Sequence, residues 1–183
     1  HIEALAALSE EEAGRRTGDD AAALNATAAT LHLKAAERLK KSDLAHAIRE
    51  ADRALALDAT LEGAAELLDQ LLETAGRRPE RVTRLVARSE LVEGPARLSL
   101  LDRAAKIAEG EQAIEVDERL VSEDVVEAVG RLAGRYRQAR MWDRLVGLLG
   151  SVASREADEN RKSALLSEAG EAAELLGDAE QAE

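Results

Sequence analysis

A helix-breaking turn recurs along this chain roughly every 32 to 37 residues, and this spacing constrains the fold more than any other feature. The turns fall at Ser42, Gly76, Ala108, Arg140 and Gly177. Each interval holds two segments of helical length, separated by a short break that is polar or contains glycine. Repeats of this length are typical of helix pairs that bury their apolar faces only by stacking on neighbouring pairs. The spacing therefore predicts an all-α stack of antiparallel helix pairs.

Ten complete helices are expected, followed by an eleventh that the end of the chain cuts off. Their approximate bounds are 2–16, 20–40, 43–57, 61–75, 79–92, 95–108, 111–121, 123–139, 141–155 and 159–176. Pro79 and Pro95 suit the first residue of a helix, where no backbone N–H is needed. Ser122 is expected to cap the eighth helix. Gly177 and Asp178 are expected to form the turn into the eleventh helix.

The composition favours helices that pack through small side chains. Ala and Leu supply most of the expected core, whereas the chain has no Phe, one Tyr and one Trp. Ala and Leu lead the helix-propensity scale, and no long stretch alternates apolar and polar residues, so a sheet is not expected. Tyr136 and Trp142 flank a predicted turn and are expected to reach the same seam between helices. We expect Trp142 to be largely buried, the alternative being a half-exposed ring on the convex surface.

The formal net charge of −12 argues against binding to nucleic acid or to an anionic membrane surface. It favours a soluble protein and, weakly, a basic partner, although a solvated acidic surface is the preferred explanation of the charge. No apolar run approaches the ~18 residues of a membrane span, and no signal peptide is visible. A cytoplasmic location is therefore expected. A periplasmic one stays open, because the chain begins at His1 rather than Met and is expected to be a fragment of a longer protein.

Small residues at fixed positions carry a resemblance to a known family. In the segment 42–58, Ala47 and Ala54 occupy the two positions where paired helices pack closest, and Ala35 stands at the matching position of the preceding helix. The segments 133–142 and 170–182 repeat parts of this pattern. The chain therefore resembles the tetratricopeptide repeat superfamily, in a degenerate bacterial-type form. The implied domain spans residues 1–183, with repeat units at about 1–19 (partial), 20–59, 60–93, 94–122, 123–158 and 159–183 (partial).

The resemblance implies a right-handed α-solenoid whose first helices line a groove for a partner protein or peptide. The groove positions carried over from the family are His32, Ala36, Leu39, Glu66, Gln70, Glu73, Leu98, Asp102, Lys106, Gly130, Gly134, Arg137, Ser167, Glu171 and Glu174. Their acidic bias predicts a partner with Lys or Arg opposite Glu66, Glu73 and Asp102. The Lys and Asn with which chaperone-binding members grip a carboxylate are absent from the matching positions. The alternatives are self-association through the end helices and a spacer role in a multidomain protein.

No motif for catalysis, cofactor binding or metal binding is found in the sequence. It lacks a phosphate loop, a dinucleotide fingerprint, HExxH, GxSxG and a calcium loop, and it has no Cys. His32 and His46 lie where they would face each other across one helix pair, but no third ligand is evident, so a surface or structural role is expected. We expect no enzyme activity and no cofactor. An enzyme or small-molecule sensor is the least favoured alternative.

Overall fold

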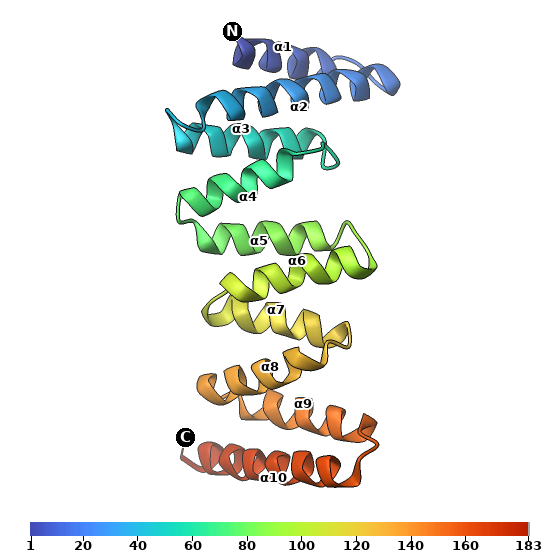
Figure 1. Cartoon of the computed structure of the whole chain (residues 1–183), viewed down its shortest axis with the longest axis vertical. Coiled ribbons are helices and arrows are strands. Elements are labelled where there is room, and N and C mark those ends of the chain that lie inside the picture. The colour runs from blue at the N-terminus through green and yellow to red at the C-terminus, as the bar shows by residue number, and fades with distance from the viewer. Residues whose placement is uncertain (183) are drawn as a thin grey trace. The chain divides into compact units, whose positions relative to one another are not determined.

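The computed structural model describes the backbone of residues 1–182 and the side chains of residues 1–177. Over this part the chain forms ten α-helices and no strand (Figure 1), which confirms the predicted all-α class. The helices are α1 (Ile2–Gly14), α2 (Asp19–Leu39), α3 (Leu44–Leu57), α4 (Ala64–Thr74), α5 (Arg78–Ser89), α6 (Gly94–Ile107), α7 (Gly110–Ser122), α8 (Val126–Ala139), α9 (Trp142–Arg155) and α10 (Glu159–Ala182). Each overlaps one of the ten predicted segments.

The chain divides into two compact units, His1–Arg84 and Leu85–Glu183, with the boundary inside α5. Within each unit, successive helices run in alternate directions (Figure 1), and each of α1 to α3 and of α6 to α9 packs on the helix that follows it in the chain. In the first unit the most extensive contacts join α1 to α2 and α2 to α3. In the second unit they join α9 to α10. In the part of the chain that is described, every helix is too short or too polar to cross a membrane.

Alanine sets the close approach of α1, α2 and α3. Ala28, Ala29 and Ala36 on α2 are fully buried, as are Ala6 on α1 and Ala47 on α3. A methyl side chain lets two helix backbones come close, so dispersion contacts are many. Each methyl also removes little apolar area from water. Close packing here therefore goes with modest hydrophobic stabilisation.

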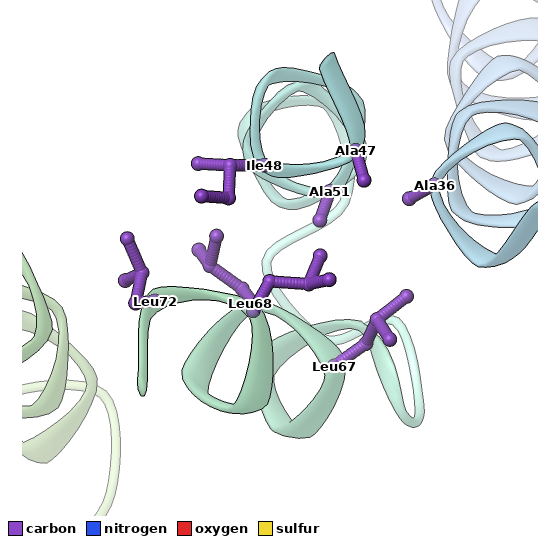
Figure 2. Close-up of a cluster of buried hydrophobic side chains, with 8 residues drawn as sticks. Ala36, Ala47, Ile48, Ala51, Leu67, Leu68 and Leu72 are labelled. Carbon is purple, nitrogen blue, oxygen red and sulfur yellow. The ribbon is translucent and has the colours of Figure 1, made fainter. Parts of the chain in front are cut away.

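Leucine fills the wider space between α3 and α4. Figure 2 shows Leu67, Leu68 and Leu72 of α4 beneath Ile48 of α3, with Ala36 of α2 at the edge of the same cluster. The buried positions of α4 follow a helical period and share one face. This face anchors α4 to the Ala-rich helices before it.

One core cluster of the second unit lies between α8, α9 and α10. Its buried members are Leu132, Ala133, Tyr136, Leu145, Leu149, Ala169 and Ala172. Tyr136 is only 5% exposed, whereas Trp142 is partly buried and packs against the cluster from outside. The predicted aromatic seam therefore exists, and the partly buried Trp142 lies between the largely buried ring that was expected and the half-exposed alternative. Trp142 is the first residue of α9, beside the turn, where fewer side chains surround it.

Two of the predicted helix boundaries can be checked against side-chain chemistry. Asp43 caps α3 by accepting the backbone N–H of His46 at 2.9 Å. Ser122 does not cap α8. It ends α7, where its hydroxyl donates to the carbonyl of Arg119 at 2.6 Å, and α8 begins later, after Val125.

The predicted turn at Gly177 and Asp178 is wrong, because α10 continues through both residues to Ala182. A glycine inside a helix costs about 1 kcal/mol relative to alanine. That cost does not end a helix whose other residues are mainly Ala, Leu and Glu. No eleventh helix begins within residues 1–182.

Candidate binding groove

An open groove of about 780 Å³ lies in the second unit, at the end where α7 joins α8 and α9 joins α10. It is lined by the last turn of α7, the first turns of α8, the second half of α9 and the first half of α10. Most of the lining is apolar. The apolar side chains are Val121, Val125, Val126, Val129, Leu148, Val152, Ala164 and Leu165. A groove of this size matches the volumes at which proteins bind small ligands or segments of a partner chain.

Val126 is the most exposed large apolar side chain of this groove. It is 78% exposed at the first residue of α8, and Val129 follows one turn later on the same helix. No side chain caps the N-terminus of α8, where Val125 donates its backbone N–H to the Leu120 carbonyl at 3.1 Å and Val126 presents apolar surface. Exposed apolar side chains that gather at a concave surface mark interaction sites more often than isolated ones do.

Ion pairs neutralise most of the charged side chains around the groove. Arg155 of α9 pairs with Asp124 at 3.1 Å, between α9 and the connection from α7 to α8. Arg137 of α8 pairs with Glu168 of α10. Among the described residues, the Arg161 guanidinium at the start of α10 has no ion-pair partner. The groove is thus mainly apolar, and among its described lining residues Arg161 and Glu156 are the charged side chains without an ion pair.

Two acidic residues of α7 tie the helices beneath the groove together. Asp117 is fully buried and accepts hydrogen bonds from Arg131 at 3.0 Å and from Arg135 at 2.7 Å, both on α8. Glu118 accepts from the Tyr136 hydroxyl at 2.6 Å and from Arg144 of α9 at 2.9 Å. These contacts fix α7 against α8 and α9.

Burial and the neighbouring Glu118 carboxylate raise the pKa of Tyr136 to about 12. Both causes act in the same direction, because each disfavours the tyrosinate form.

Sequence reasoning missed Asp117. Its signal is an acidic residue on the otherwise apolar face of α7 formed by Ala113, Val116 and Leu120.

The groove positions predicted in the first unit divide into two kinds. Glu66, Gln70 and Glu73 share one exposed face of α4, and Glu73 pairs with Arg81 at 3.0 Å. His32 does not line an open surface, because it is only 7% exposed and lies between α1 and α3. Ala36 is fully buried in the core cluster, and Leu39 is packed against it.

The positions predicted in the second unit lie mostly on exposed helix faces. Asp102 and Lys106 pair with each other along α6 at 2.7 Å, and Leu98 on the same helix is partly buried. The remaining exposed positions are Gly134, Arg137, Ser167, Glu171 and Glu174. Of the predicted positions, Gly130 alone lines the groove described above.

A second polar cluster lies between α1, α2 and α3. His32 of α2 contacts Glu50 of α3 through Nδ1 at 2.7 Å and Glu10 of α1 through Nε2 at 2.5 Å. His46 Nε2 lies 3.2 Å from the other oxygen of Glu50, so the two histidines contact the same carboxylate. Arg53 donates to Glu10, and this hydrogen bond lowers the pKa of Glu10 below its ordinary value. Within the described residues, no group of three His, Cys, Asp or Glu side chains is arranged to hold a metal ion.

Comparison with known proteins does not assign a function to this chain. The chain matches no protein-family model and no curated protein sequence. The chemistry of the groove, an apolar lining at the junction of four helices, is therefore the observation from which a function is argued.

Proposed function

We propose that this chain is a protein-interaction module of the tetratricopeptide-repeat type, which binds a segment of a partner protein in the groove formed by α7, α8, α9 and α10. Each compact unit would then be a piece of a right-handed α-solenoid built from antiparallel helix pairs. The alternating direction of successive helices and their short connections support this architecture.

The single observation that carries the proposal is the apolar lining of an open groove, with Val126 78% exposed at its edge. Covering this lining would remove apolar surface from water, which is the main driving force of association. Because the groove is open, it suits an extended or helical segment of another chain more than an enclosed small molecule.

The charges favour a partner that is mainly apolar over a strongly basic one at this site. Glu168 and Asp124 are already paired with Arg137 and Arg155. The basic partner predicted from Glu66, Glu73 and Asp102 is a separate proposal for the faces of α4 and α6. Glu73 and Asp102 already have cationic neighbours, so Lys substitutions there should alter only the rate and salt dependence of binding.

Selection of a random-peptide library on the immobilised protein tests the proposal. The matched variants are Val126→Asp in the groove and Leu91→Asp in the connection between α5 and α6. Both introduce a carboxylate at an exposed apolar position, since Leu91 is 67% exposed. Peptides selected on the wild type should bind Leu91→Asp normally and lose at least about tenfold in affinity for Val126→Asp, since tenfold corresponds to ~1.4 kcal/mol. Equal binding to both variants would exclude this groove as the site.

Self-association is the second candidate function, and exposed leucines on two helices favour it. Leu5 and Leu8 lie on α1, and Leu166 and Leu175 lie on α10, all four about half exposed or more. Light scattering over a concentration series distinguishes the two candidates. A mass that stays at the monomer value of 19.6 kDa at every concentration removes self-association and leaves the groove proposal intact.

A further inference from the structure

A cluster of basic side chains occupies the end of α2 and the turn that leads into α3 (Figure 1). Lys34 and Arg38 lie one turn apart on α2, and Lys40 and Lys41 follow in the turn. These four residues, named the α2 basic patch, are all exposed, and Glu37 is the single acidic residue within the stretch 34–41. The patch therefore concentrates positive charge on a chain whose net charge is −12.

The rest of the chain does not neutralise the α2 basic patch. Within the described residues, none of its four side chains makes a hydrogen bond or an ion pair. Exposed arginines elsewhere in the first unit are paired, Arg53 with Glu10 and Arg84 with Asp52. Asp and Glu outnumber Lys and Arg by 37 to 25, so the composition alone favours an acidic neighbour for every cation. The lack of partners is thus a property of this surface.

Stabilisation of α2 explains only part of this charge. Cations near the C-terminus of a helix interact favourably with the helix dipole, and this effect falls off within the last turn. Arg38 lies in the last turn of α2, and Lys40 and Lys41 lie directly after it. Lys34 lies more than one turn before Leu39, the last residue of α2. The dipole therefore does not account for Lys34, which extends the patch along the exposed face of the helix.

We propose that the α2 basic patch binds an acidic segment of a partner protein through its Asp and Glu carboxylates. From Lys34 to Lys41 the patch covers about 10 Å, at ~1.5 Å per residue of helix. An extended segment of three to four residues has the same length, at ~3.3 Å per residue. Lys and Arg donate hydrogen bonds and cannot accept them, so carboxylates complement the patch in both charge and hydrogen bonding.

The acidity of the remaining surface favours a short segment over a long polyanion. Outside the patch the chain is even more acidic than its net charge of −12 indicates. A nucleic acid or an anionic membrane extends well beyond the patch and would meet this surface within a Debye length, about 8 Å at physiological ionic strength. A segment of a few residues touches the patch alone. The patch belongs to the first unit and the groove around Val126 to the second, so the two proposals stand or fall separately.

Two double variants of equal charge separate the patch from a general charge effect. Lys34→Gln/Arg38→Gln removes two cations from the patch. Arg49→Gln/Arg140→Gln is the matched control, because both arginines are exposed and their side chains also have no partner among the described residues. Both double variants change the net charge by the same amount. Glutamine is a good helix former, so the helices are expected to persist in both.

Titration of the ¹⁵N-labelled protein with a short poly-glutamate peptide, followed by amide NMR, gives the location and the affinity. At about 20 mM salt the peptide should shift the signals of residues 34–41, and raising the salt to about 150 mM should weaken binding. Lys34→Gln/Arg38→Gln should lower the affinity at least about fivefold, whereas the control and Val126→Asp should bind as the wild type does. A poly-glutamine peptide of the same length should cause no shifts.

Three results would overturn the proposal. The first is a wild-type protein whose signals at residues 34–41 do not move with the peptide. The second is an equal loss of affinity in the two double variants, which would show that only the net charge matters. The third comes from titrating the same protein with duplex DNA or with phosphatidylserine vesicles: tighter binding at residues 34–41 than the peptide shows would assign the patch to a polyanion instead.

Discussion

Tyr136 gives a quantitative electrostatic prediction, because it is the single tyrosine of the chain and its hydroxyl is buried against a carboxylate. Burial, followed by the hydrogen bond to Glu118, raises its pKa from 10.0 to about 12. Between these two values the unfolded chain loses a proton that the folded protein keeps. The folded pKa is the higher one, so the stabilisation is complete below the unfolded pKa and is lost as the pH rises through the folded pKa. A difference of about two pKa units corresponds to roughly 3 kcal/mol.

Two measurements check this prediction. Ultraviolet absorbance of tyrosinate, followed against pH in the folded protein, should give a midpoint near 12 in the wild type. In Glu118→Gln the midpoint should move toward the ordinary value without reaching it, because burial of the ring persists. The free energy of unfolding of the wild type minus that of Tyr136→Phe should decrease over the same pH range. A phenol that titrates at its ordinary pKa while circular dichroism still shows a folded protein would refute this reasoning.

Three further predictions concern the free energy of unfolding, which urea unfolding measures, and amide hydrogen exchange locates the effect of Trp142→Ala. Trp142→Ala should lower the free energy of unfolding by about 2 kcal/mol, less than the ~3–5 kcal/mol lost when a fully buried aromatic ring is removed. The amide protection of α8 to α10 should fall while that of α2 to α4 stays unchanged. An equal loss of amide protection in both units would contradict this prediction. Asp117→Asn should lower the free energy of unfolding by about 3 kcal/mol, because two arginines then face a neutral group at a fully buried position. A change under ~1 kcal/mol would show instead that the two arginine side chains turn to solvent. Gly170 lies inside α10 with open space around its Cα, so Gly170→Ala should raise the free energy of unfolding by about 0.5–1 kcal/mol. Gly76 has a φ of +67°, so Gly76→Ala should lower it by about 1–2 kcal/mol. Effects of the same sign would contradict the argument that backbone conformation decides the outcome at these two glycines.

The helices were predictable because their signals are local. Asp43 caps α3 through a residue three positions away, and a left-handed Gly76 ends the first half of a helix pair. The two errors arose where one local signal was given too much weight. Ser122 has the composition of a cap but bonds backward into α7, and Gly177 is a single glycine within a strongly helical segment.

The two polar clusters were not predictable, because each joins residues that only the packing of different helices brings together. Glu50 and Glu10 lie 18 and 22 positions from His32, on the helices after and before it. The sequence pattern identified both histidines but gave no reason to choose these partners among many glutamates. The groove was missed for a related reason. Its apolar lining comes from helix ends around Val126, whereas the family positions followed the middle of each first helix.

The most direct test of the proposed function is to locate a selected peptide on the protein by methyl NMR. With Val, Leu and Ile methyl groups labelled, binding of a peptide from the library should shift the signals of Val126, Val129 and Val152 and leave those of Leu67 and Leu71 on α4 unchanged. The same peptide should produce no shifts in Val126→Asp. Shifts confined to α4 or to the exposed leucines of α1 and α10, with the groove signals unmoved, would contradict the proposed site.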